Sequence, residues 1–138
     1  MKLIPTEAQE QIALMEWAAI TPFVLINTFT QIAVTKKISD YLIAIPNGGS
    51  RHKTEAFNLK RQGVRPGASD LFFAVPRGKF HGLWIELKRK KGGELSFAQS
   101  SFILSMQLAG YKAVVAHGFD EARSEISSYL SEKSCDII

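Results

Sequence analysis

The stretch that decides the fold is residues 70–88, DLFFAVPRGKFHGLWIELK, which is typical of two strands joined by a short turn. Leu71–Val75 and Gly82–Lys88 are apolar runs of strand length, and the link Pro76–Phe80 carries Pro and Gly. We therefore predict a β-hairpin with its tip at Gly78.

Charged residues occupy unusual positions in this hairpin. Side chains alternate along a strand, so Glu86 and Lys88 share one face of the second strand. A tip at Gly78 places Asp70 directly opposite Glu86, where Cβ atoms lie about 4.5–5.5 Å apart. Two carboxylates that close repel each other unless a proton or a cation lies between them. Their oxygen ligands suit Mg²⁺ or Mn²⁺ better than zinc, which prefers His and Cys.

Other polar residues extend this predicted site. The Lys88 ammonium lies one pair along from Glu86 and could orient a water molecule and neutralise charge on an attacked phosphate. Glu7 or Glu10, in the first predicted helix, could add an outer carboxylate. Gln99 lies in the first turn of the helix predicted from Ser96 to Gly110, at the start of its core-facing stripe. There it either points into the site or hydrogen-bonds nearby backbone. The alternative for Glu86 and Lys88 is an ordinary ion pair on one strand face.

The elements outside the hairpin alternate between helix and strand. We predict a helix that Thr6 caps and that runs to about Ile20, and a strand over Tyr41–Ile45. The remaining predicted elements are a helix around Phe29–Ile38, a basic helix capped by Ser50 and ending near Gln62, a helix from Ser96 to Gly110, a strand over Lys112–Ala116 and a helix from Asp120 to Leu130. This order predicts an α/β domain with a mixed sheet flanked by helices.

Composition sets limits on the class of protein. The chain has 138 residues, of which 46% are hydrophobic, and this suits one domain over residues 1–138 with a real core. Its longest apolar stretches are broken well before the ~20 residues that a membrane helix needs. The start of the chain does not resemble a signal peptide. The single cysteine, Cys135, cannot form an internal disulfide, so we expect a reducing, cytoplasmic setting.

Positive charge is clustered along the chain, which carries a net charge of +4. Such clusters are the footprint of a protein that binds a phosphate backbone, although a solvated surface is the plainer alternative. We expect phosphate contacts from Asn47, Arg51 and Lys53 near the end of the predicted Tyr41–Ile45 strand. We expect further contacts from the basic run that follows the hairpin, namely Arg89, Lys90 and Lys91.

These motifs together resemble a known family. Gly67–Asp70, then Glu86–Lys88, then Leu95–Gln99 resemble the D…E-x-K…Q signature of the PD-(D/E)XK nuclease superfamily. The stretch Ile45–Gly49 and the Gly-Gly pair after Glu86-Leu-Lys-Arg89 are similar to the stand-alone VRR-NUC proteins of bacteria and phages. The resemblance spans about residues 6–130.

The resemblance implies a restriction endonuclease-like core and Mg²⁺- or Mn²⁺-dependent hydrolysis of phosphodiester bonds. By this resemblance, Asp70, Glu86 and the carbonyl of Leu87 would bind the metal. Lys88 would position the nucleophilic water and Gln99 would support the site. The first-helix glutamate of the family aligns best with Glu7, with Glu10 as the rival.

Stand-alone members of the family are similar to homodimeric nucleases that act on branched DNA such as Holliday junctions. The resemblance therefore implies DNA, a second copy of the chain and a bacterial or phage-infected cell. The alternatives are flap or end processing, restriction-type cleavage, or a non-catalytic nucleic-acid-binding module.

Two departures from the family pattern stand out. Ser69 replaces the usual Pro before the metal-binding Asp, and we expect activity to survive this change because the Pro only shapes the backbone. The segment 22–40 is longer than a compact member needs, so it could cover a sheet edge, build a dimer contact or shape access to the site.

Overall fold

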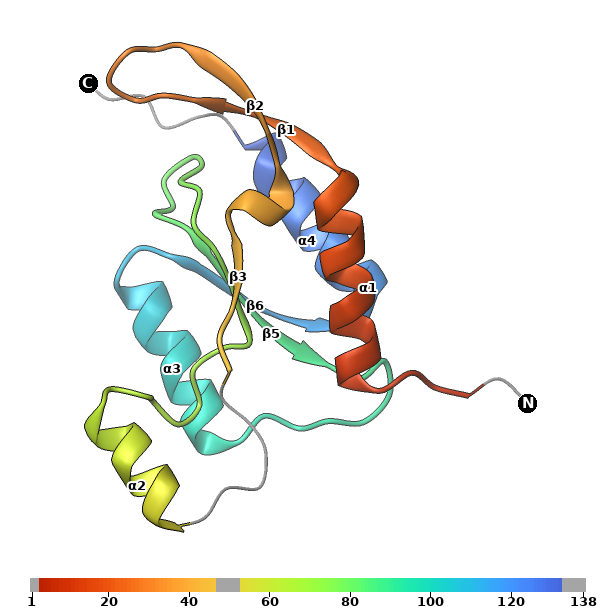
Figure 1. Ribbon diagram of the computed structural model, residues 1–138, viewed down its shortest axis with the longest axis vertical. Coiled ribbons are helices and arrows are strands. Elements are labelled where there is room, and N and C mark those ends of the chain that lie inside the picture. Colours follow the sequence, from red (N-terminus) through yellow and green to blue (C-terminus); the bar gives the residue numbers. More distant parts are fainter. Residues whose placement is uncertain (1–2, 47–52, 133–138) are drawn as a thin grey trace.

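A computed structural model describes residues 3–46 and 53–132 of the chain (Figure 1). Its helices are α1 (Glu7–Ile20), α2 (Lys53–Arg61), α3 (Phe97–Leu108) and α4 (Phe119–Ser131), with a short 3₁₀ turn over Ile38–Asp40. Its strands are β1 (Pro22–Ile26), β2 (Ala33–Lys37), β3 (Leu42–Ala44), β4 (Leu71–Phe73), β5 (Leu83–Lys88) and β6 (Lys112–His117). No helix in these described ranges has both the length and the apolar character needed to cross a membrane.

The central sheet has four strands in the order β3-β4-β5-β6. Strands β3, β4 and β5 pair antiparallel, whereas β6 pairs parallel to β5. Helices α1 and α4 cover one face of this mixed sheet, and α3 packs against the other (Figure 1). The predicted α/β architecture is confirmed.

The predicted hairpin register is also confirmed, since Leu71 pairs with Ile85 and Phe73 with Leu83. The alternation of β5 divides its side chains between two environments. Leu83, Ile85 and Leu87 point into the main core, which includes residues of α1 and α4. The opposite face carries Trp84, Glu86 and Lys88 toward α3, where the Trp84 and Phe102 rings meet edge to face at 5.0 Å.

Residues 29–38 do not form the helix that the sequence predicted. Instead, β1 and β2 make an antiparallel hairpin in which Val24 pairs with Thr35. The Asn27 side chain accepts hydrogen bonds from the N–H groups of Phe29 and Thr30, and this local bonding favours a turn over a helix. β-branched residues on both strands favour extended backbone. The helix predicted around residues 29–38 is therefore wrong, because the composition of this segment favours strands.

The hairpin β1–β2 is anchored to the rest of the domain by a buried cation. The Arg77 guanidinium, from the link between β4 and β5, donates to the Val24 carbonyl at 2.7 Å. Figure 1 shows the hairpin at one end of the molecule and α2 at the other. The hairpin β1–β2 therefore lies away from the end of the molecule that carries α2.

Candidate active site

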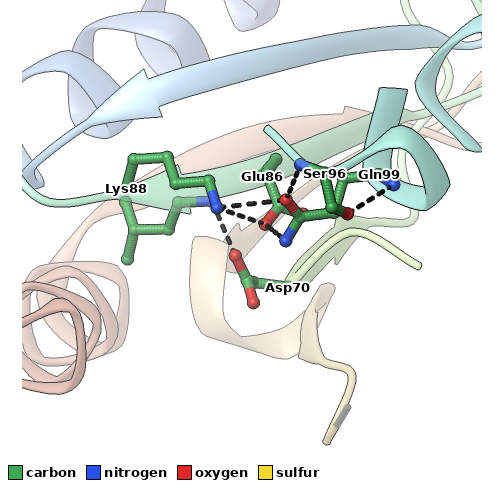
Figure 2. Close-up of polar contacts among 6 residues, drawn as sticks. Asp70, Glu86, Lys88, Ser96 and Gln99 are labelled. Carbon is green, nitrogen blue, oxygen red and sulfur yellow. Dashed lines mark hydrogen bonds and ion pairs between the residues drawn. The ribbon is translucent and has the colours of Figure 1, made fainter. Parts of the chain in front are cut away.

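Four polar side chains from three parts of the chain meet at the carboxyl end of β5 (Figure 2). Asp70 comes directly before β4, Glu86 and Lys88 lie on β5, and Gln99 belongs to the first turn of α3. The antiparallel register of β4 and β5, continued by one residue, brings Asp70 opposite Glu86. The structure therefore brings together the residues that the hairpin argument selected.

Gln99 connects this group to the start of α3. Its Oε1 accepts a hydrogen bond from the Ser96 N–H at 2.9 Å and another from Lys88 Nζ at 3.1 Å. Its Nε2 donates to Glu86 Oε1 at 2.8 Å. Ser96 Oγ in turn accepts from the Gln99 N–H, which completes a capping box. The two interpretations of Gln99 from sequence are thus both correct, since one amide caps the helix and orients two site residues.

Glu86 is the most strongly perturbed acid of the group. Only 2% of the residue is exposed, and its Oε2 has no hydrogen-bond partner within the described part of the chain. Burial, followed by the charge of the neighbouring Asp70 carboxyl, raises the pKa of Glu86 from the ordinary 4.5 to about 8 against the opposing effect of Lys88. An acid in this environment takes up a proton unless a cation compensates its charge.

Asp70 is held in place by the backbone of β5. Its Oδ2 accepts a hydrogen bond from the Leu87 N–H at 2.7 Å. The Lys88 carbonyl faces β6, because it accepts from the Gly118 N–H at 2.9 Å. Peptide groups alternate in direction along a strand, so the Leu87 carbonyl points to the opposite side, toward Asp70. Two carboxylates and one backbone carbonyl therefore border the same space.

Lys88 completes the group from the same face of β5. Its Nζ lies 3.8 Å from Glu86 Oε1, and only 8% of the residue is exposed. The hydrogen bond to Gln99 and the attraction of Glu86 fix the ammonium beside the two acids. The predicted ion pair between Glu86 and Lys88 exists, but as one part of a larger buried cluster.

The donor set fits a hard divalent cation. The unpartnered, buried Glu86 Oε2 beside Asp70 supplies an oxygen that needs a positive partner. Within the described ranges, no group of three or more His, Cys, Asp and Glu side chains is arranged to hold a metal. A cation here would have few protein ligands and would keep several waters, which suits Mg²⁺ or Mn²⁺ rather than zinc.

The structure separates the two candidate glutamates of α1. Glu10 is buried and accepts a hydrogen bond from the Phe119 N–H at 2.6 Å, at the amino end of α4. It therefore joins α1 to α4, and its expected role in the site stays a prediction. Glu7 is exposed, and its negative charge is the smallest of the causes that raise the pKa of Glu86, so its role in the site also stays a prediction.

Sequence reasoning missed two backbone-related roles. The Leu87 N–H fixes Asp70, and the Glu10 carboxylate caps α4. The second role had a visible signal, because Glu10 lies four residues before Leu14 on the buried and otherwise apolar face of α1. An acid on such a face needs buried donors, which the amino terminus of another helix provides.

Four of the predicted phosphate-binding residues belong to the part of the chain that the structure describes. Lys53, Arg89, Lys90 and Lys91 are all exposed. The Arg89 guanidinium donates to the Ile4 carbonyl at 3.5 Å, and Lys90 Nζ lies 3.9 Å from Asp120. The predictions for Asn47 and Arg51 fall outside the described residues, as does the predicted cap at Ser50.

Comparison with known proteins assigns the domain. Neither a protein-family model nor a curated protein matches the sequence. Among solved structures, a protein described as a VRR_NUC domain protein matches with a TM-score of 0.76 and 29% sequence identity, over 98% of this chain and all of the other. The mixed sheet with paired acids at the end of its central hairpin defines an α/β domain of the nuclease class. More narrowly, the chain is similar over nearly its whole length to a VRR-NUC domain.

Proposed function

We propose that this chain is a metal-dependent endonuclease that hydrolyses phosphodiester bonds in branched DNA such as four-way junctions. The observation that carries the proposal is the buried Glu86 carboxylate, which lies against Asp70 with one oxygen unpartnered in the described structure and with Lys88 alongside. Structural cores seldom contain such a group without compensation, whereas metal-dependent hydrolases need it.

The proposed cofactor is Mg²⁺ or Mn²⁺, held by Asp70, Glu86 and the Leu87 carbonyl, and it supplies Lewis-acid chemistry at the phosphate. The Leu87 N–H orients Asp70 through its Oδ2. Gln99 fixes Glu86 Oε1 and the Lys88 ammonium at the same time. The catalytic centre is therefore held rigid by helix capping before substrate arrives.

Lys88 is the residue that we propose to act on the reacting atoms. Its ammonium donates a hydrogen bond to the attacking water or to a non-bridging phosphate oxygen, and it offsets the negative charge that develops on the phosphate. Glu7 would add a further carboxylate at the outside of the site, because its negative charge acts on Glu86.

A homodimer is the assembly that suits this substrate. A symmetric four-way junction needs two cuts related by a two-fold axis, and a dimer with C2 symmetry presents two equivalent sites. We place this activity in the cytoplasm of a bacterial or phage-infected cell, following the stand-alone proteins that the sequence resembles. A monomeric mass for the active protein in size-exclusion chromatography with light scattering would contradict the dimer.

Two other functions are compatible with the same domain. Flap or end processing and restriction-type cleavage use the same chemistry on other DNA, and a non-catalytic module would only bind. The intact set of Asp70, Glu86 and Lys88 argues against the non-catalytic module, because a protein that only binds DNA has no need for a buried acidic pair.

The test compares labelled linear, flap and four-way-junction DNA, each with Mn²⁺, with Mg²⁺ and with a chelator. We expect cleavage of the junction only when the metal is present. Lys88→Ala should bind the junction and fail to cut it, while the matched Lys79→Ala, in the exposed turn between β4 and β5, should cut normally. Binding of all three DNAs by the wild-type protein without cleavage would favour the non-catalytic module, and a wild-type rate for Lys88→Ala would refute its role.

A further inference from the structure

Helix α2 is attached to the domain in an unusual way. None of its nine residues is buried, and Leu59 is its only residue that is even half-buried. Helices in globular proteins owe most of their stability to packing an apolar face. A helix that offers so little to the core is expected to find its packing partner elsewhere.

The exposed face of α2 is basic. Lys53, Phe57, Lys60 and Arg61 stand at spacings of i, i+4, i+7 and i+8, which places them on one face of the helix. We call these four residues the basic stripe. All four are exposed, and Leu59 lies on the far side of the helix from them. The one acid of the helix, Glu55, also lies off the stripe.

The cations of the stripe are free to meet a ligand. In the ranges 3–46 and 53–132, the ion pairs of the structure involve none of Lys53, Lys60 and Arg61. The Arg61 guanidinium lies 5.9 Å from the centre of the Phe57 ring, which is itself 61% exposed. The stripe therefore combines uncompensated positive charge with an exposed aromatic side chain.

A packed loop ties α2 to the candidate active site. Gly67 has a φ of +84°, and a Cβ at this position would lie 2.4 Å from the Ala98 carbonyl carbon in the first turn of α3. Asp70 follows three residues later, and Gln99 is the next residue after Ala98. The Arg65 guanidinium lies 5.9 Å from the Phe102 ring centre. The loop thus holds α2 at the end of the molecule where the site lies (Figure 1).

We propose that the basic stripe of α2 binds the phosphate backbone of the DNA that flanks the scissile bond. This inference rests on the proposed nuclease function. It adds a DNA-binding surface on α2 to the one expected at the basic run of residues 89–91, which follows β5. Three cations on one face of α2, without carboxylate partners, attract a polyanion. The phosphate backbone of DNA is such a polyanion, with negative charges at regular intervals along the double helix. In the complex, DNA would contact the face of α2 that packs against no other part of the described structure.

The test measures how DNA affinity depends on salt. Fluorescence anisotropy of a labelled four-way junction, with a chelator present to prevent cleavage, gives Kd between roughly 50 and 200 mM salt. Each lost phosphate contact lowers the slope of log affinity against log salt by about 0.9. Lys60→Ala/Arg61→Ala should therefore reduce the slope by about two and weaken binding by about tenfold or more at roughly 100 mM salt.

The matched control is Lys36→Ala/Lys37→Ala, which removes the same charge from β2, a strand that lies away from α2 (Figure 1). The control should keep the wild-type slope and Kd. The thermal midpoint of Lys60→Ala/Arg61→Ala should stay at the wild-type value, because both replaced side chains are exposed. An unchanged midpoint excludes misfolding as the reason for weak binding.

Two results would overturn the proposal: a wild-type slope for Lys60→Ala/Arg61→Ala, or an equal loss of affinity in the control. Failure of the proposed function gives a different result. If the wild-type protein cleaves the junction while the α2 variant binds normally, only the basic stripe is refuted. If the wild-type protein neither binds nor cleaves any of the DNAs, both proposals fall.

Discussion

The sharpest prediction concerns the replacement Glu86→Gln in the metal-free protein. Burial and the Asp70 carboxyl raise the pKa of Glu86 from 4.5 to about 8. At a pH between these two pKa values, Glu86 holds a proton in the folded protein but has released it in the unfolded chain. The free energy of unfolding of the wild-type protein therefore falls as pH rises through this window.

The size of the effect follows from the width of the window. One proton contributes at most about 1.4 kcal/mol per pH unit, which sets a ceiling of about 5 kcal/mol between the two pKa values. Glutamine stays neutral at every pH, and its carbonyl can still accept from Gln99 Nε2. We expect Glu86→Gln to match the wild type at about pH 5 and to be more stable by a few kcal/mol at about pH 8.

Urea unfolding in the presence of a chelator measures this difference directly. The exposed Glu16→Gln, on the outer side of α1, makes the same chemical change outside the site and is the control. A difference between Glu86→Gln and the wild type that stays constant from about pH 5 to about pH 8 would refute the reasoning. Adding Mn²⁺ at about pH 8 should stabilise the wild type, and should fail to stabilise Glu86→Gln, because the variant lacks one carboxylate ligand.

Three further changes test the surroundings of the site. Ser69→Ala should raise the free energy of unfolding by about 1 kcal/mol in urea titrations, because the buried Ser69 hydroxyl has no partner within the described residues; a loss of stability would contradict this. Gly67→Ala should destabilise the fold by about 2 kcal/mol or more, since alanine strains the positive φ and its Cβ meets the Ala98 backbone, and a wild-type melting curve would disprove that contact. Gln99→Ala should cost about 1–2 kcal/mol and lower the cleavage rate about 10–100-fold, because it removes both the cap of α3 and the contacts to Glu86 and Lys88. Full cleavage with reduced stability would limit Gln99 to a structural role.

Much of the site could be predicted from local sequence because a hairpin is a local structure. A short turn fixes the register of two neighbouring strands, and the period of two fixes which side chains share a face. The sequence alone therefore predicts that Asp70, Glu86 and Lys88 lie together, and the pairing of β4 with β5 confirms that register. The caps of α1 and α3 are equally local, since each needs only residues within one helical turn.

The segment 22–40 shows where local reasoning fails. Its apolar residues fit either a helix or strands by periodicity alone, and the outcome depended on turn bonding at Asn27 and on the anchor that Arg77 provides from a distant loop. The role of Glu10 depended likewise on α4, whose first residue lies more than a hundred positions away along the chain.

The sequence by itself determined the α/β class, the hairpin register and the acidic pair, because these follow from periodicities and turns within a few residues. Only the tertiary structure decided that Glu10 caps α4 and that α2 leaves its basic face uncovered. The physical reason is that burial and hydrogen-bond partners depend on which distant elements pack together, and no local pattern contains that information.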